Sequence, residues 1–161
     1  MLQKKRLTKE QALPQIKQYC AYQERSHKEA REKLYSFGLY KADVEQLITQ
    51  LIEEDYLNEE RFAKQFSGGK FRMKNWGRIK ITYELRQKMV SSYSIKIALK
   101  EIEESAYMLT LKKLAAAKWK SLKMEPALSK KSKTYTFLLG KGYEAPLVQK
   151  VLAELDEADE K

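Results

Sequence analysis

The sequence predicts an all-α fold, arranged as a tandem array of three three-helix units and elongated rather than globular. Apolar residues recur at helical spacing through most of the chain, and the best strand-like alternation, at 79–83, lies inside a longer helical pattern. The three prolines and six glycines fall where helices would break. A set of six apolar or glycine positions recurs twice, at offsets of 51 and 104 residues.

This repeat defines the expected domain organisation. The three-helix units lie at 8–54, 58–103 and 105–155, with flexible tails at 1–7 and 156–161. Because a unit of this size buries only a small core, stacked neighbours cover what remains exposed, and the array is extended. The first helix of each unit matches its counterparts only in length and helical pattern. The repeated positions are Leu34, Gly38, Leu39, Val44, Leu47 and Leu51, then Leu85, Met89, Val90, Ile95, Ala98 and Ile102, then Leu138, Gly142, Tyr143, Val148, Val151 and Leu155.

The first helix of the chain has a clear cap and an ambiguous start. Thr8 is a good N-cap for a helix that carries Ala12 and Ile16 on one side. Pro14 lies too deep for the first turn of that helix. The helix therefore begins nearer Leu13 or kinks at the proline.

The next two helices of the first unit are better defined. Ser26 and Glu29 form a capping box, and Gly38 suits the left-handed position after a helix that runs through Phe37. A third helix then presents an apolar face inward. Its inward residues are Val44, Leu47, Ile48 and Leu51.

The middle unit opens with a capped helix and then becomes strongly basic. Asn58 is a good N-cap, and Glu59 and Glu60 place negative charge where a helix N-terminus favours it. Between residues 61 and 100 the chain has eleven lysines and arginines but a single acid, Glu84, so this segment carries a charge of +10, equal to that of the whole chain. Such a concentration of like charge indicates a polyanionic partner, nucleic acid before membrane.

The basic segment supplies the candidate binding residues. Phe71, Trp76 and Tyr83 alternate with cations in the way that phosphate contact and base stacking require, although we favour a packing role for Trp76. The candidates for contact with DNA or with a filament are Arg72, Lys74, Arg78, Lys80, Arg86 and Lys88. A second basic cluster extends into the third unit, where segment 123–133 is the expected loop. Its members are Lys112, Lys113, Lys118, Lys120, Lys123, Lys130, Lys131 and Lys133.

Composition argues against several other classes of protein. One cysteine, Cys20, permits no internal disulfide and fits a reducing, cytoplasmic setting. One histidine, His27, expected on an exposed helix start, leaves no usual zinc ligand set and no hydrolase triad. No apolar run approaches the ~18 residues of a membrane helix. We expect a monomer without catalytic residues, metal or cofactor.

Several motifs together resemble the RecX family of recombinase regulators. The run from Tyr56 to Ala63, followed by Phe66, is the most specific of them. Weaker matches extend the resemblance from about residue 12 to residue 155. The main motif residues are Tyr56, Leu57, Arg61, Phe62, Ala63, Trp76 and Gly77.

The resemblance implies a function that the basic segment would serve. It implies helical repeats that bind the bacterial RecA recombinase and its filament, modulate strand exchange in DNA repair and the coupled damage response, and have no catalytic residues. We expect inhibition, although the resemblance is equally consistent with stimulation. The alternative is a stand-alone, sequence-nonspecific protein that binds single- or double-stranded DNA. Met89 departs from the glycine frequent in this family, so we expect its turn to be open to a different geometry.

Overall fold

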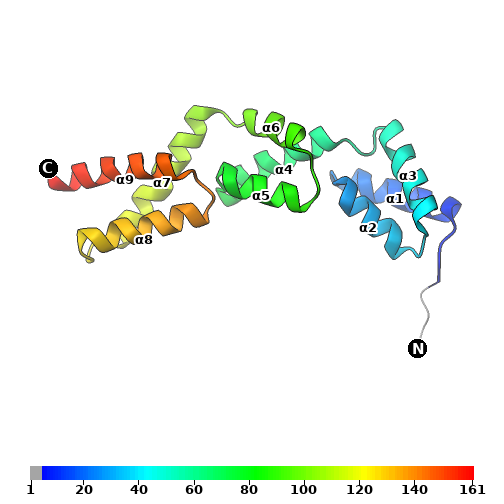
Figure 1. Ribbon diagram of the computed structural model, residues 1–161, viewed down its shortest axis with the longest axis horizontal. Coiled ribbons are helices and arrows are strands. Elements are labelled where there is room, and N and C mark those ends of the chain that lie inside the picture. Colours follow the sequence, from blue (N-terminus) through cyan, green and yellow to red (C-terminus); the bar gives the residue numbers. More distant parts are fainter. Residues whose placement is uncertain (1–4) are drawn as a thin grey trace. The chain divides into compact units, whose positions relative to one another are not determined.

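The computed structural model describes residues 5–161, which form nine helices and no strand (Figure 1). The all-α prediction is therefore confirmed. The helices are α1 (Lys9–Tyr22), α2 (His27–Ser36), α3 (Lys41–Glu53), α4 (Glu59–Lys74), α5 (Arg78–Gln87), α6 (Ser92–Lys100), α7 (Glu104–Ser121), α8 (Ala127–Gly140) and α9 (Ala145–Glu160).

These helices are distributed over two compact bodies. The N-terminal body contains the described residues up to Phe66 together with Leu85–Ala98, and the C-terminal body contains Ser67–Glu84 together with Leu99–Lys161. The chain therefore passes from one body to the other within α4, within α5 and near the end of α6. Each body has its own core.

The N-terminal body is built on α1, α2 and α3, which all contact one another. Thr8 caps α1 in a capping box with Gln11, which rules out a start near Leu13 and leaves Pro14 inside the helix. Ser26 caps α2 in a second box with Glu29, as the sequence predicts. The core comprises Ala12, Ile16, Cys20, Ala30, Leu34, Leu39, Val44, Leu47, Ile48, Leu51 and Leu57.

The expected N-terminal tail is partly bonded to this body. Residues 1–4 of the tail lie outside the described residues. The Leu7 N–H donates to the Phe37 carbonyl at 2.9 Å, and the Arg6 guanidinium carbon lies 4.6 Å from the centre of the Tyr40 ring. Arg6 and Leu7 are therefore held in place rather than free.

In the C-terminal body, α7, α8 and α9 contact one another. The loop expected over residues 123–133 is shorter, because α8 begins at Ala127. Glu125 sits just before that helix and accepts hydrogen bonds from Ser129 Oγ, at 3.0 Å, and from Lys133. A carboxylate that binds two side chains of the first turns holds residues 127–133 in helical form.

The acidic C-terminus is also ordered where a flexible tail is expected. Helix α9 continues through Glu160. Asp159 Oδ2 accepts from Trp119 Nε1 at 2.8 Å and from Lys130 Nζ at 2.7 Å, and Asp156 pairs with Lys131 at 2.8 Å. These bonds to α7 and α8 explain why the tail does not fray.

The turns after α2, α5 and α8 share one geometry. Gly38, Met89 and Gly142 all have positive φ, of 88°, 62° and 98°. In each turn this residue's N–H donates at 2.9 Å to the carbonyl three residues earlier. Met89 therefore adopts the conformation that glycine adopts elsewhere, at a cost of roughly 1–2 kcal/mol, and the expectation of a different turn is wrong.

Candidate nucleic-acid and filament interface

The turn between α4 and α5 is held tightly within the C-terminal body. The Gly77 N–H donates to the Lys141 carbonyl at 2.8 Å, and the Ile79 N–H donates to the Gly142 carbonyl at 2.9 Å. A Cβ atom on Gly77 would lie 2.4 Å from the carbonyl carbon of Gly142. Glycine is therefore required at position 77 for the two backbones to approach this closely.

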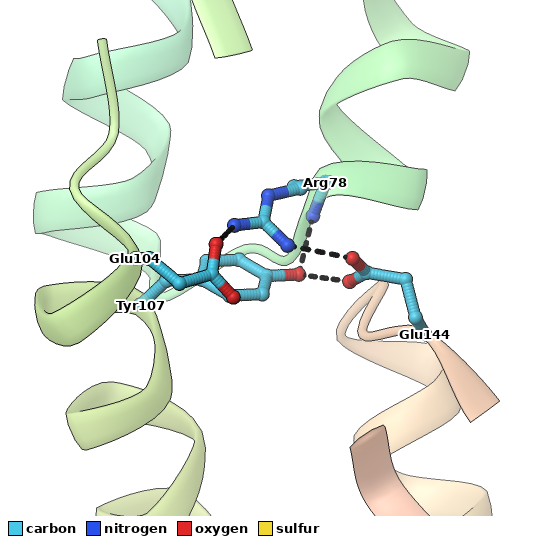
Figure 2. Close-up of polar contacts among 4 residues, drawn as sticks. All are labelled: Arg78, Glu104, Tyr107 and Glu144. Atoms are coloured by element: carbon cyan, nitrogen blue, oxygen red, sulfur yellow. Dashed lines mark hydrogen bonds and ion pairs between the residues drawn. The ribbon is translucent and has the colours of Figure 1, made fainter. Parts of the chain in front are cut away.

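Arg78 occupies the centre of a polar network beside this turn (Figure 2). Its guanidinium donates to Glu144 Oε2 at 2.8 Å and also to Glu104, and its backbone N–H donates to the Tyr107 hydroxyl at 2.9 Å. The Tyr107 hydroxyl donates in turn to Glu144 Oε1. Only 21% of the Arg78 side chain is exposed.

Aromatic rings surround the network. The Tyr107 ring lies 5.9 Å from that of Phe71 and 5.1 Å from that of Tyr143, measured between centroids. Burial raises the pKa of the Tyr107 hydroxyl well above its usual range and raises that of Tyr143 to about 12, so both rings stay neutral. Phe71, which the sequence offers as a stacking platform, belongs to this core.

The backbone N–H groups at the start of α5 are already engaged and are not available to an anion. The N–H groups of Gly77, Arg78 and Ile79 all donate within the C-terminal body. A helix N-terminus is a ready anion site only when such groups are available. Phosphate contact in this region therefore depends on lysine and arginine side chains, and Arg78 is engaged with two glutamates.

Three other predicted binding residues of this body remain accessible. Arg72 and Lys74 are exposed in the last turn of α4, and Lys80 is half-buried. In the described part of the chain, none of the three forms an ion pair with a carboxylate. Lys80 Nζ instead lies 4.8 Å from the centre of the Trp76 ring, and Lys70 Nζ lies 5.1 Å from it. Trp76 is half-buried, and its ring offers a face to these two cations.

The remaining two predicted residues, Arg86 and Lys88, belong to the N-terminal body. Arg86 is exposed. Lys88 Nζ lies 3.5 Å from Glu29 Oε1 and 5.8 Å from the centre of the Phe66 ring. Lys88 is therefore partly neutralised by its own body.

Sequence reasoning named Tyr83 in this region but missed Lys141 and Ile79. Lys141 Nζ reaches the Lys74 carbonyl at 3.4 Å and adds a cation beside the turn, although it is 67 residues away in the chain. Ile79 is 54% exposed and Tyr83 is 60% exposed, one helical turn apart on α5. The four-residue spacing of Ile79 and Tyr83 in the sequence predicts that they lie on one face of a helix.

Most of the motif residues at 56–63 serve the fold instead. Leu57, Phe62 and Ala63 are buried, and Tyr56 is half-buried. Arg61 donates to Glu24, and to the Asp55 carbonyl at 2.9 Å. The Glu24 hydrogen bond, followed by the pairing with Asp55, raises the pKa of Arg61.

Two further searches of residues 5–161 gave negative results. No helix there is both long and apolar enough to span a bilayer. No group of three or more His, Cys, Asp or Glu residues there is placed to hold a metal ion.

Comparisons with known proteins find similarity to proteins and structures named RecX. A family model described as "RecX, second three-helix domain" matches residues 58–99. A protein named "Regulatory protein RecX" from Prosthecochloris aestuarii is 31% identical over 137 residues, which cover 85% of this chain and 88% of that protein. Another of that name, from Clostridium perfringens strain SM101, is 34% identical over 121 residues, covering 74% of this chain and 56% of that protein. The crystal structure of RecX from Lactobacillus salivarius superposes with a TM-score of 0.83 at 22% identity, over 92% of this chain and 96% of that one.

Proposed function

The chain belongs to the RecX family of regulatory proteins, and we propose that it binds the RecA recombinase and its nucleoprotein filament and inhibits strand exchange. We propose further that it acts as a cytoplasmic monomer, by binding alone and without a catalytic step. The observation that carries the proposal is the set of predicted binding residues around the α4–α5 turn that are accessible and have no carboxylate partner among residues 5–161. These are Arg72, Lys74 and Lys80.

The physical argument rests on charge and on exposed rings. Lysine and arginine side chains that neutralise phosphates release condensed counterions, which favours binding and makes it sensitive to salt. Tyr83 is exposed on α5 of the same body and offers a face for stacking on an unpaired base. Because Arg78 is bonded to two glutamates, its proposed contact with DNA is replaced by a role in holding the turn that carries the others.

A co-sedimentation experiment tests the partner. The protein is spun with RecA and short single-stranded DNA at physiological salt, and with DNA alone. Recruitment that depends on RecA supports the proposal, together with reduced strand exchange in a parallel assay. Equal binding without RecA would instead identify a stand-alone DNA-binding protein, and undiminished strand exchange would contradict inhibition.

A salt titration tests the residues. Replacing Arg72, Lys74 and Lys80 together with alanine should flatten the plot of log affinity against log salt by about 2–3, since each phosphate contact contributes about 0.7–0.9. The matched control replaces Lys112, Lys113 and Lys120, which are exposed in the same body and have no carboxylate partner in the described chain. If the slope flattens equally in the control variant, the α4–α5 turn has no special role in binding. An unchanged slope in both variants would show that the partner is not phosphate.

A further inference from the structure

The two bodies contain corresponding positions at the starts of their helices. Helix α2 begins at His27 as α5 begins at Arg78, and α4 begins at Glu59 as α7 begins at Glu104. Likewise Ser91 directly precedes α6, and Glu144 directly precedes α9. His27 and Arg78 are 51 residues apart, as are the positive-φ residues Gly38 and Met89. Ser91 and Glu144 are 53 residues apart, as are the positive-φ residues Met89 and Gly142. In the C-terminal body the three positions form the network of an arginine with two carboxylates.

The N-terminal body has His27 where the C-terminal body has Arg78 and Ser91 where it has Glu144, so only the carboxylate at the start of α4, Glu59, is kept. Glu59 Oε1 accepts from the Ser91 N–H at 2.7 Å, and Glu59 Oε2 accepts from the hydroxyls of Ser91 and Ser94 at 3.0 Å each. Burial opposes ionisation of Glu59, but these hydrogen bonds hold its pKa below the ordinary value, so it is charged at neutral pH. His27 Nε2 is shielded from solvent and has no hydrogen-bond partner among the described residues.

A hollow of about 450 Å³ lies beside these groups, and we call it the His27 pocket. None of the described residues that line it is lysine or arginine. Asp55 is paired with Arg61 at 3.1 Å, whereas Glu60 has no ion-pair partner in the described chain. The side chains that bear on ligand choice are His27, Asp55, Glu59, Glu60, Tyr93 and Ser94.

The chemistry of the pocket selects a planar organic cation. Its carboxylates attract positive charge, and no group of three or more His, Cys, Asp or Glu residues among residues 5–161 is placed to hold a metal ion, which favours an organic cation. Tyr93 is 68% exposed and can lie against a guanidinium, as Tyr107 lies against Arg78 with 3.7 Å between the guanidinium carbon and the ring centre. The volume falls at the small end of ligand sites, which suits one side chain rather than a large cofactor.

We propose that the His27 pocket binds an arginine side chain presented by a partner protein. The arginine would give Glu59 and Glu60 a cation, as Arg78 gives Glu104 one within the C-terminal body. This interaction is separate from the contacts with phosphates proposed above, because it uses carboxylates of the N-terminal body and requires no DNA.

The first test uses N-acetyl-arginine amide as the probe and the full chain as the target, followed by NMR. We expect saturable shifts at Tyr93, at Ser94 and in the backbone of 55–60. The neutral isostere N-acetyl-citrulline amide should leave these resonances in place, because only the cation pairs with carboxylates. Equal shifts with both compounds would overturn the proposal.

Matched variants separate the pocket from general attraction to acidic surface. Glu60→Gln should weaken binding of the arginine probe about two- to fivefold, the effect of one partly exposed charge. Glu53→Gln is the control, because Glu53 is exposed and does not line the pocket. An equal loss in the control would mean nonspecific attraction and would reject the site. Glu60→Gln should leave the salt dependence of DNA binding unchanged, so this proposal and the proposed function can fail independently.

The ring contact is tested separately. Tyr93→Phe should keep the affinity for the arginine probe, and Tyr93→Leu should lower it about two- to fivefold, the effect of one exposed cation–π contact. Tyr93 is exposed, so neither change should disturb the fold, as circular dichroism can verify. Full affinity in Tyr93→Leu would contradict the proposed geometry.

Discussion

The guanidinium carbon of Arg78 lies 3.7 Å from the centre of the Tyr107 ring, while the N–H of the same arginine donates to the hydroxyl of that ring at 2.9 Å. Tyr107 is fully buried. Burial by itself would lower the pKa of Arg78, but the hydrogen bonds that it donates to Glu144 and Glu104 raise it. The pair therefore fixes the start of α5 on α7 and keeps the arginine charged.

Replacing Arg78 should destabilise the C-terminal body. Arg78→Ala leaves Glu144 without its cation and should lower the free energy of unfolding by about 2–3 kcal/mol. Arg78→Lys should recover only part of this, because an ammonium cannot contact both carboxylates with one planar fork. Chemical denaturation measures both. Lys112→Ala is the exposed control and should change stability by less than about 0.5 kcal/mol.

Two glycines should respond in opposite directions to a methyl group. Gly77→Ala forces Cβ to within 2.4 Å of Gly142 and should cost about 1–3 kcal/mol. Gly69 lies inside α4 and has no atom within 4 Å of such a Cβ, so Gly69→Ala should stabilise the protein by about 0.5–1 kcal/mol. Thermal unfolding of the two variants measures both changes in stability. A stable Gly77→Ala protein would contradict the close contact of the two turns.

Thr134 offers a stabilising substitution. It is fully buried in α8, and its hydroxyl has no hydrogen-bond partner among residues 5–161. Thr134→Val keeps the shape, removes the unsatisfied hydroxyl and should raise the free energy of unfolding by about 1 kcal/mol. Thr136→Val, on the exposed side of the helix, should have little effect in the same denaturation experiment. A loss of stability in Thr134→Val would imply a partner for that hydroxyl.

Stability should fall on mild acidification because of His27. Burial lowers the pKa of His27 from its ordinary 6.5, so as the pH falls through 6.5 the unfolded chain takes up a proton before the folded chain does. The free energy of unfolding should therefore be smaller at pH 5.5 than at pH 7.5. Among residues 5–161, four carboxylates have pKa values lowered from ordinary values of 4.5 or less, so they do not contribute in this window: Glu45, Glu59, Glu125 and Asp159. In the His27→Gln variant the free energy of unfolding should be the same at pH 5.5 and pH 7.5. If the variant keeps the difference between the two pH values, another group causes it.

The elongated shape stays a prediction. Stacked three-helix units should give a radius of gyration clearly above the ~15 Å expected of a compact domain of this length. Small-angle X-ray scattering measures this quantity directly. A value near 15 Å would show that the units fold back on one another.

The parts of the fold set by local residues could be predicted from the sequence. The capping boxes at Thr8 and Ser26 and the end of α2 before Gly38 follow from short-range spacing. Met89 was misjudged because its turn is closed by backbone hydrogen bonds, which do not require glycine.

The candidate site was less predictable because its decisive contacts are distant in sequence. Nothing near Arg78 distinguishes it from Arg72 or Lys80, since its two carboxylates lie 26 and 66 residues further along the chain. The order of the C-terminal tail depends in the same way on a bond across 40 residues, from Trp119 to Asp159. Spacing within a helix carries no information about such pairs.

The division of α4, α5 and α6 between two bodies bears on how the chain can be truncated. A stop codon after the second repeat, near residue 103, would leave Ser67–Glu84 without the α7–α9 helices of its own body. A fragment that starts at α7 would uncover one side of Tyr107, which normally contacts Phe71 and the start of α5. Expression of the second or the third repeat alone should therefore give aggregation-prone polypeptides, even though the repeats are clear in the sequence.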